Sequence, residues 1–158
     1  MNSKEVLVRM LERQQESFLK TLQRVPEDKL DWMPGEGTRS ARDQAQEVAT
    51  ILQEFWEIYE TRKMTWDMER WNSYMESRAQ VHTVADIEKS LQECTARLIA
   101  FVQGLPEEEL GAKTEMPFPG EFLLVDNINY HIWNMAYHEG QITTILQLLG
   151  LGNEESQD

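Results

Sequence analysis

The pattern with the clearest chemical content lies in the last third of the chain, where polar side chains interrupt an apolar helical stripe. Over residues 122–149 apolar residues recur three and four apart, which predicts a long helix. The same face also carries Asn127, His131, Asn134 and His138. Burying an imidazole or an amide costs about 1–3 kcal/mol unless the group finds a hydrogen-bond partner or a metal ion. The stretch that holds the last two of these residues is therefore the first candidate for a functional site.

Asn134 and His138 also have a spacing that suits metal binding. They lie four residues apart, so one helical turn separates them and both can contact one ion if a third ligand comes from a facing helix. A pair of this kind is weak evidence by itself. Without a ligand, His138 would be an ordinary core histidine whose ring bonds to a carboxylate or a carbonyl. The residues alone therefore leave a metal site and a hydrogen-bonded core site open.

The composition limits the classes of partner. The 158 residues carry 15 Lys and Arg against 28 Asp and Glu, a formal net charge of −13 at pH 7. This charge repels phosphate backbones and anionic membranes, so we expect no nucleic acid and no membrane as partner. The sequence has no signal-peptide pattern and no run of 18 apolar residues, which predicts a cytoplasmic protein. The lone cysteine, Cys94, fits a reducing compartment and is expected in the core.

Four long segments with apolar residues three and four apart must position the candidate side chains. Nothing between them alternates with the period of two that is typical of a strand. The expected helices run, in chain order, from Ser3 as N-cap to Val25, over 41–62 behind Ser40 as N-cap, from Thr83 as N-cap to Gly104, and over 122–149 up to Gly150. Four such helices predict an all-α four-helix bundle.

The connections complete this prediction. Residues 27–32 are expected to form a short helical turn, and 107–122 a loop. Residues 63–82 hold irregularly spaced Trp and Met side chains, so they form either a partly helical connection over the bundle or a partner surface. This long crossover between the second and third helices would allow those helices to be parallel. We expect one domain over 1–152 and a frayed acidic tail over 153–158.

The five tryptophans and eight methionines allow two interpretations. Methionine adapts to irregular gaps, so these side chains could simply fill the bundle core. Alternatively, aromatic residues and methionine are enriched at interfaces, so some tryptophans could line a pocket mouth or a dimer face. The candidates for this second role are Trp56, Trp66, Trp71 and Trp133.

Four motifs, in order along nearly the whole chain, resemble those of the DinB-like (YfiT-like) superfamily. The most distinctive, residues 134–142 (NMAYHEGQI), resembles the signature of the final helix. The other three resemble the segment after helix 1, the start of helix 2 and the loop before helix 4. They are residues 25–34 (VPEDKLDWMP), 39–42 (RSAR) and 118–120 (FPG).

The resemblance implies a four-helix bundle, a homodimer and a divalent metal, such as nickel or zinc, held by three histidines. One of these histidines comes from helix 2 and two from helix 4. Carried onto this sequence, the last ligand is retained as His138, the earlier helix 4 position is Asn134, and the helix 2 position is Glu47. Two of the three histidines are therefore replaced.

These replacements change the donor chemistry. A carboxylate at Glu47 can still ligate a divalent ion, whereas the amide of Asn134 is a poor ligand for zinc or nickel. His131 is a substitute candidate one turn before Asn134, although its Cα would lie about 10 Å from that of His138, which strains a shared ion. Glu47 sits at the rim of the apolar face of its helix, so a solvated or hydrogen-bonding glutamate is the alternative.

Two functions follow as expectations. The first is a divalent-metal-dependent enzyme acting on a small molecule, either a hydrolase or a transferase resembling the thiol S-transferases of the superfamily. The second is a non-catalytic homodimeric bundle with a degenerate metal site, acting as a binding or stress-response module. In that case Asn134 and Glu47 hydrogen-bond to His138 instead of holding an ion. The sequence assigns no catalytic residue and no organic cofactor.

Overall fold

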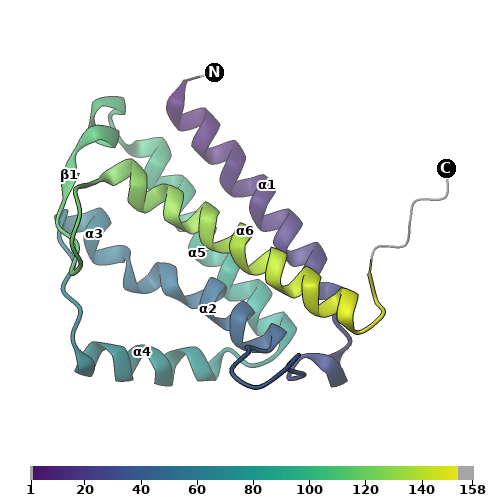
Figure 1. Ribbon diagram of the computed structural model, residues 1–158. Helices are drawn as coiled ribbons and strands as arrows, with labels where there is room; N and C mark the ends of the chain where they lie inside the picture. Colours follow the sequence, from purple (N-terminus) through teal and green to yellow (C-terminus); the bar gives the residue numbers. More distant parts are fainter. Residues whose placement is uncertain (1, 153–158) are drawn as a thin grey trace.

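A ring of four long helices forms the body of the protein (Figure 1). The computed structural model describes residues 2–152, so the tail expected to fray over 153–158 lies outside the described residues. The long helices are α1 (Ser3–Gln23), α2 (Ala41–Glu54), α5 (Val84–Gly104) and α6 (Leu124–Leu148). The expected four-helix bundle is therefore confirmed.

The crossover makes α2 and α5 parallel. Ser90 Oγ near the start of α5 donates to the carbonyl of Ala49 (2.8 Å), and Gln53 Nε2 contacts Cys94 Sγ one turn later (3.5 Å). Cys94 is buried, as expected for a core residue. The 63–82 connection is therefore a crossover long enough to make the second and third long helices parallel, as its length allowed.

The first and last helices are also parallel. Gln14 Nε2 in α1 donates to Glu139 Oε2 in α6 (2.5 Å), and Arg24 just after α1 donates to the carbonyl of Leu151 just after α6 (2.8 Å). Both α1 and α2 contact α5 and α6, so α1 and α2 lie at opposite corners of the ring. One consequence is that α2 and α6 are direct neighbours.

The helix starts follow from side-chain capping, with one correction. Asn2, not Ser3, is the N-cap of α1: its Oδ1 accepts from the backbone N–H of Glu5 (2.9 Å), and its own N–H donates to Glu5 Oε2 (2.9 Å). Asparagine caps a helix at least as well as serine does. The reciprocal pair also gives two backbone N–H groups, those of Asn2 and Glu5, a side-chain acceptor each. Ser40 and Thr83 are N-caps as expected.

The helix expected over 41–62 is interrupted at Phe55. It consists of α2 and a short helix, α3 (Trp56–Thr61), because the N–H of Ile58 donates to the carbonyl of Phe55, only three residues back (3.0 Å). A three-residue hydrogen-bond step is a local tightening that apolar periodicity does not reveal. The connection that follows contains a helix of its own, α4 (Met68–Gln80), which lies alongside α2 (Figure 1).

The segment around the loop expected over 107–122 departs from the all-helical prediction by forming two short strands. Strand β1 (Lys113–Thr114) pairs antiparallel with β2 (Phe122–Leu123), and α6 begins only after this pair. Two-residue strands are too short to show a period-two pattern, so apolar periodicity could not predict them. The short helical turns lie at Glu27–Lys29, within the expected 27–32, and at Glu107–Gly111.

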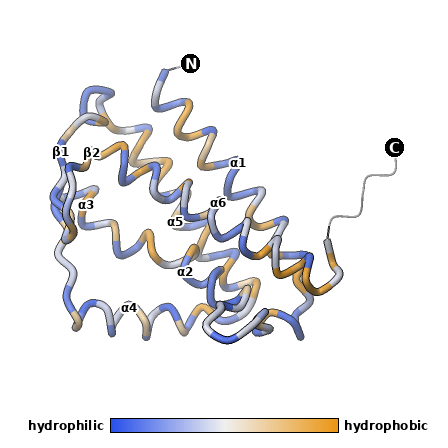
Figure 2. Tube along the Cα trace, viewed as in Figure 1, coloured by the Kyte–Doolittle hydropathy of each residue, from blue (hydrophilic) through white to orange (hydrophobic). Residues whose placement is uncertain are grey.

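The apolar stripes of the four long helices meet inside the ring. Figure 2 shows hydrophobic residues recurring between hydrophilic ones along each of these helices, and the buried hydrophobic residues form one core cluster. No helix among the described residues combines the length and the apolar character that crossing a bilayer requires.

Candidate polar centre between α2 and α6

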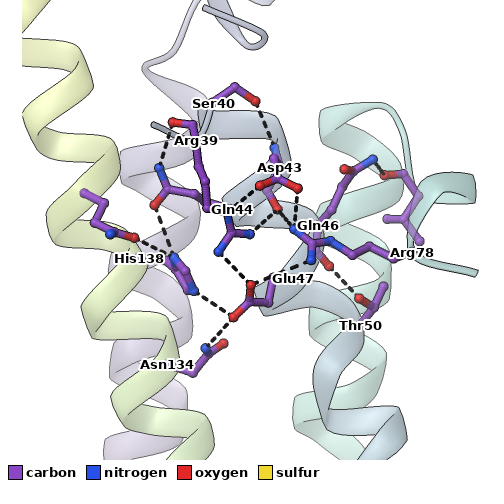
Figure 3. A network of polar contacts seen from close by, with 12 residues as sticks. Arg39, Ser40, Asp43, Gln44, Gln46, Glu47, Thr50, Arg78, Asn134 and His138 are labelled. Atoms are coloured by element: carbon purple, nitrogen blue, oxygen red, sulfur yellow. Dashed lines mark hydrogen bonds and ion pairs between the residues drawn. The ribbon is translucent and has the colours of Figure 1, made fainter. Parts of the chain in front are cut away.

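The three residues predicted to form a site come together between α2 and α6 (Figure 3). Glu47 lies on α2, and Asn134 and His138 lie one turn apart on α6. Glu47 Oε1 is 3.0 Å from His138 Nε2 and accepts from Asn134 Nδ2 at 3.3 Å. The prediction that a glutamate of the second long helix faces an imidazole of the last one therefore matches the geometry.

The second ring nitrogen of His138 also faces acceptors. Its Nδ1 lies 2.8 Å from Gln141 Oε1 and 3.1 Å from Gln44 Oε1. The orientation of the Gln44 amide is fixed, because its Nε2 donates to the carbonyl of Arg39 (3.3 Å). Since acceptors face both nitrogens, the surroundings suit a ring that donates a hydrogen bond from each. His138 is only 2 % exposed, so its ring is fixed in the protein interior and is not accessible to act as a base from solvent.

Two arginines occupy the other side of the glutamate. Arg39 lies 2.8 Å from Glu47 Oε2, and Arg78 of α4 lies 3.7 Å from the same oxygen. Both guanidinium groups also pair with Asp43, one turn before Glu47 on α2. The carboxylate of Glu47 is therefore surrounded by donors: His138 and Asn134 on one oxygen, and arginines on the other.

These partners determine the charge state of Glu47. Burial raises the pKa of its carboxyl group, but the hydrogen bond to His138 and the positive charges of Arg39 and His138 outweigh burial and lower the pKa to about 2. Glu47 is thus ionised at neutral pH, and its charge is compensated within the protein.

The donor set does not fit nickel or zinc. It offers one imidazole, one amide and one carboxylate that already pairs with Arg39, whereas such sites use three strong histidine, cysteine or carboxylate ligands. Among residues 2–152, no group of three or more His, Cys, Asp or Glu side chains could hold a metal ion. The buried Oδ1 of Asn134 has no hydrogen-bond partner in this part of the chain, but an amide oxygen is a weak ligand for these metals.

The other polar residues of the α6 stripe have partners elsewhere. His131 Nε2 lies 3.1 Å from Thr95 Oγ1 of α5, so the proposed substitute ligand is directed to α5 and not to Glu47. Its complete burial lowers the pKa of the ring to about 4, which keeps it neutral at pH 7. Asn127 Nδ2 donates to Thr114 Oγ1 (2.8 Å) and to the carbonyl of Leu123 (3.0 Å).

The sequence interpretation missed four contributors to this centre. Asp43 and Glu47 lie one turn apart on the second helix, and Arg39 lies just before its N-cap Ser40, four residues before Asp43; this charge spacing could have been recognised in the sequence. Gln44 lies three residues before Glu47 and carries no charge pattern. Arg78 comes from the connection whose spacing predicts no single structure, so no local signal places it near Glu47.

An apolar cavity of about 440 Å³ adjoins the polar centre along the same pair of helices. Ile51, one turn after Glu47, and Tyr130, one turn before Asn134, both line it. Trp66 also lines this cavity, in agreement with one of the two roles considered for the tryptophans.

Comparison with known proteins supports the fold. The model of the DinB family matches residues 1–156. YfiT from Bacillus subtilis, described as a probable metal-dependent hydrolase with an unusual four-helix bundle topology, superposes with a TM-score of 0.77 at 15% identity, covering 95% of this chain and 90% of that one. A DinB-like protein from Bacillus cereus ATCC 10987 gives a TM-score of 0.69 at 13% identity, covering 92% of each chain.

A third structure of the same fold is the colibactin self-resistance protein ClbS in complex with double-stranded DNA. It superposes with a TM-score of 0.68 at 15% identity, covering 94% of this chain and 97% of that one. No curated protein matches the sequence. At these identities the solved structures establish a shared architecture and leave the chemistry to the residues themselves.

Proposed function

The chain belongs to the DinB family, and we propose that within this family it acts as a small-molecule-binding bundle whose polar centre works without a metal. One observation carries the proposal. Both carboxylate oxygens of Glu47 are engaged by protein donors, Oε1 by His138 and Asn134 and Oε2 by Arg39. The residues at the metal-ligand positions thus pair with one another through the carboxylate of Glu47, as expected for a degenerate metal site.

Electrostatics supports the same proposal. A divalent cation placed between Glu47 and His138 would lie near the guanidinium groups of Arg39 and Arg78, and repulsion from these charges weakens binding. It would also have to displace any proton on His138 Nε2, because only an unprotonated imidazole nitrogen ligates a metal. The arginine pair therefore substitutes for the ion as the positive partner of Glu47.

A metal-dependent hydrolase is the second candidate. It is favoured by the description of YfiT and by the 3.0 Å approach of Glu47 Oε1 to His138 Nε2, a separation that neighbouring ligands of one ion would also have. A thiol S-transferase would need the same occupied site. No contact among the described residues favours either reaction over metal-free binding.

Metal content distinguishes the two candidates. We expect protein purified without chelator and without a histidine tag to hold far less than one nickel, zinc, iron or manganese per chain. Its melting temperature should not change on adding these metals or a chelator. We expect His138→Ala to lower the free energy of unfolding by about 1–3 kcal/mol, whether or not chelator is present, because Glu47 and Gln141 lose their partner.

The exposed His82 provides a matched control, since His82→Ala removes an imidazole outside the centre. One metal per chain that is lost in His138→Ala and retained in His82→Ala would refute the metal-free proposal. It would establish the metal-dependent candidate instead.

The proposal also includes a homodimer and excludes nucleic acid as the ligand. Trp133 and Tyr137 are 51% and 50% exposed on α6 and stack on each other with ring centroids 5.1 Å apart, a surface suited to contact with a second copy. The net charge of −13 opposes binding to DNA phosphates. We therefore do not propose DNA as a ligand of this chain, although ClbS binds double-stranded DNA.

A further inference from the structure

We infer that the apolar cavity beside the polar centre is a binding site for an uncharged, largely aromatic small molecule. The inference rests on the proposed function in one respect, that the chain binds a small molecule, and it adds the place and the chemical class. The volume of about 440 Å³ lies within the range of cavities that hold molecules of drug size.

The cavity is built from residues that belong to four separate parts of the chain. Phe55 comes from the break between α2 and α3, Trp66 from the connection before α4, Phe118 and Phe122 from the loop around the two strands, and Tyr130 from α6. Phe55 belongs to the buried core, and Trp66 and Tyr130 pack against that core. The aromatic walls therefore lie at the edge of the core and surround the cavity.

The walls favour flat apolar ligands. Phe55 and Tyr130 stack nearly parallel, with ring centroids 4.7 Å apart and an interplanar angle of 7°, and Phe118 meets Phe122 edge to face at 5.6 Å. Aromatic rings bind other rings by such stacked and edge-to-face contacts. Tyr130 also lines the cavity, and its hydroxyl can donate a hydrogen bond to, or accept one from, a polar atom of the ligand.

Charge excludes anions from the same space. Among the residues that line the cavity, Asp126 is the only one that carries a charge at neutral pH. Neither lysine nor arginine lines the cavity. An anionic group would thus meet a carboxylate, no compensating cation, and a chain of net charge −13. An uncharged molecule pays none of this electrostatic cost.

Two fluorescent probes that differ by one sulfonate test the inference. N-phenyl-1-naphthylamine is uncharged, and 8-anilino-1-naphthalenesulfonate is its anionic counterpart. We expect the uncharged probe to bind at one molecule per chain and at least tenfold more tightly than the sulfonate. Asp126→Asn should narrow this ratio severalfold, because asparagine can still accept the hydrogen bond from Leu123 N–H that caps α6 while removing the charge.

Two matched substitutions locate the site. Met116 lines the cavity and Met33 is an exposed residue outside it, so Met116→Trp fills the space and Met33→Trp adds the same ring elsewhere. We expect Met116→Trp to weaken binding of the uncharged probe at least tenfold and Met33→Trp to leave it unchanged, with melting temperatures confirming that both variants fold. Equal binding by the two variants, or equal affinity for the two probes, would overturn the inference.

The result is separable from the metal test. Stoichiometric metal at His138 would refute the metal-free function, while probe binding could still be measured in the wild-type chain and compared with Met116→Trp. Conversely, absence of probe binding in a chain without metal would refute the ligand site alone.

Discussion

At the scale of residues, the chemistry of the centre depends on how many partners one carboxylate has. Glu47 holds together α2, α6 and the connection that carries Arg78, because its two oxygens contact His138, Asn134 and the arginines. Its partner Asp43 adds a second negative charge to the same two guanidinium groups. The stability of this arrangement should therefore depend on pH in a range set by Glu47.

Glu47→Gln should lower the free energy of unfolding by about 3 kcal/mol at pH 7, since a pKa lowered from 4.5 to about 2 corresponds to this free energy at about 1.4 kcal/mol per pH unit. The folded-state pKa lies below the unfolded one, so the contribution is complete above about pH 4.5 and is lost as the pH falls toward 2. Urea unfolding of both proteins from pH 7 to pH 2 measures this difference. A difference that does not narrow below pH 4.5, or an equal loss in the exposed control Glu76→Gln, would contradict the assignment.

A second prediction at this scale concerns the replaced ligand positions. The double variant Glu47→His/Asn134→His should be stabilised by added zinc or nickel, because His138 Nε2 lies 3.0 Å and Asn134 Nδ2 lies 3.3 Å from Glu47 Oε1, so three imidazoles at these positions would face one another. Melting temperature with and without added metal is the measurement. Adding His138→Ala to the double variant should abolish the effect; a folded double variant that ignores metal would show that α2 and α6 are not spaced for an ion.

At the scale of elements, the helices were largely predictable and their irregularities were not. Apolar periodicity and the caps Ser40 and Thr83 located the long helices, because these signals are local. The interruption at Phe55 and the strand pair β1 and β2 depend on packing between distant segments. The same division holds for the centre: spacing and resemblance indicated Glu47, Asn134 and His138, whereas Arg78 belongs to α4, whose position depends on the folded bundle.

The attachment of α4 is the element whose energetics can be tested most directly. Arg78, which is buried against Asp43, fixes α4 to α2, and Arg70 pairs with Glu54 of α2 and Glu57 of α3. Arg78→Ala should lower the free energy of unfolding by about 3 kcal/mol, because a buried charge partner is removed.

Under limited proteolysis, the same variant should be cleaved faster in the connection around α4, because local opening exposes the backbone to the protease. Lys89→Ala, which removes an exposed charge from α5, serves as the control and should change stability by less than about 0.5 kcal/mol. Unchanged proteolysis of Arg78→Ala would show that the other contacts of α4, including the ion pairs of Arg70, are sufficient to hold it in place.

At the scale of the whole molecule, we expect the exposed aromatic pair Trp133 and Tyr137 on α6 to mediate contact between two copies. We expect a homodimer in solution. Trp133→Lys should convert it to a monomer, because a charge replaces the exposed ring that stacks on Tyr137. Light scattering after size-exclusion chromatography measures the mass. The exposed Leu148, at the far end of α6, gives the control Leu148→Lys, which should remain dimeric; a wild-type monomer would refute the dimer.

The parallel course of α1 and α6 separates the two ends of the described chain by roughly one helix length, about 37 Å for 25 residues at 1.5 Å each (Figure 1). That span suits resonance energy transfer between dyes placed on engineered cysteines near either end. The native thiol of Cys94 is shielded, and its burial raises its pKa, so labelling would favour the new positions. A dye pair of this kind would report opening of the bundle in real time, one molecule at a time.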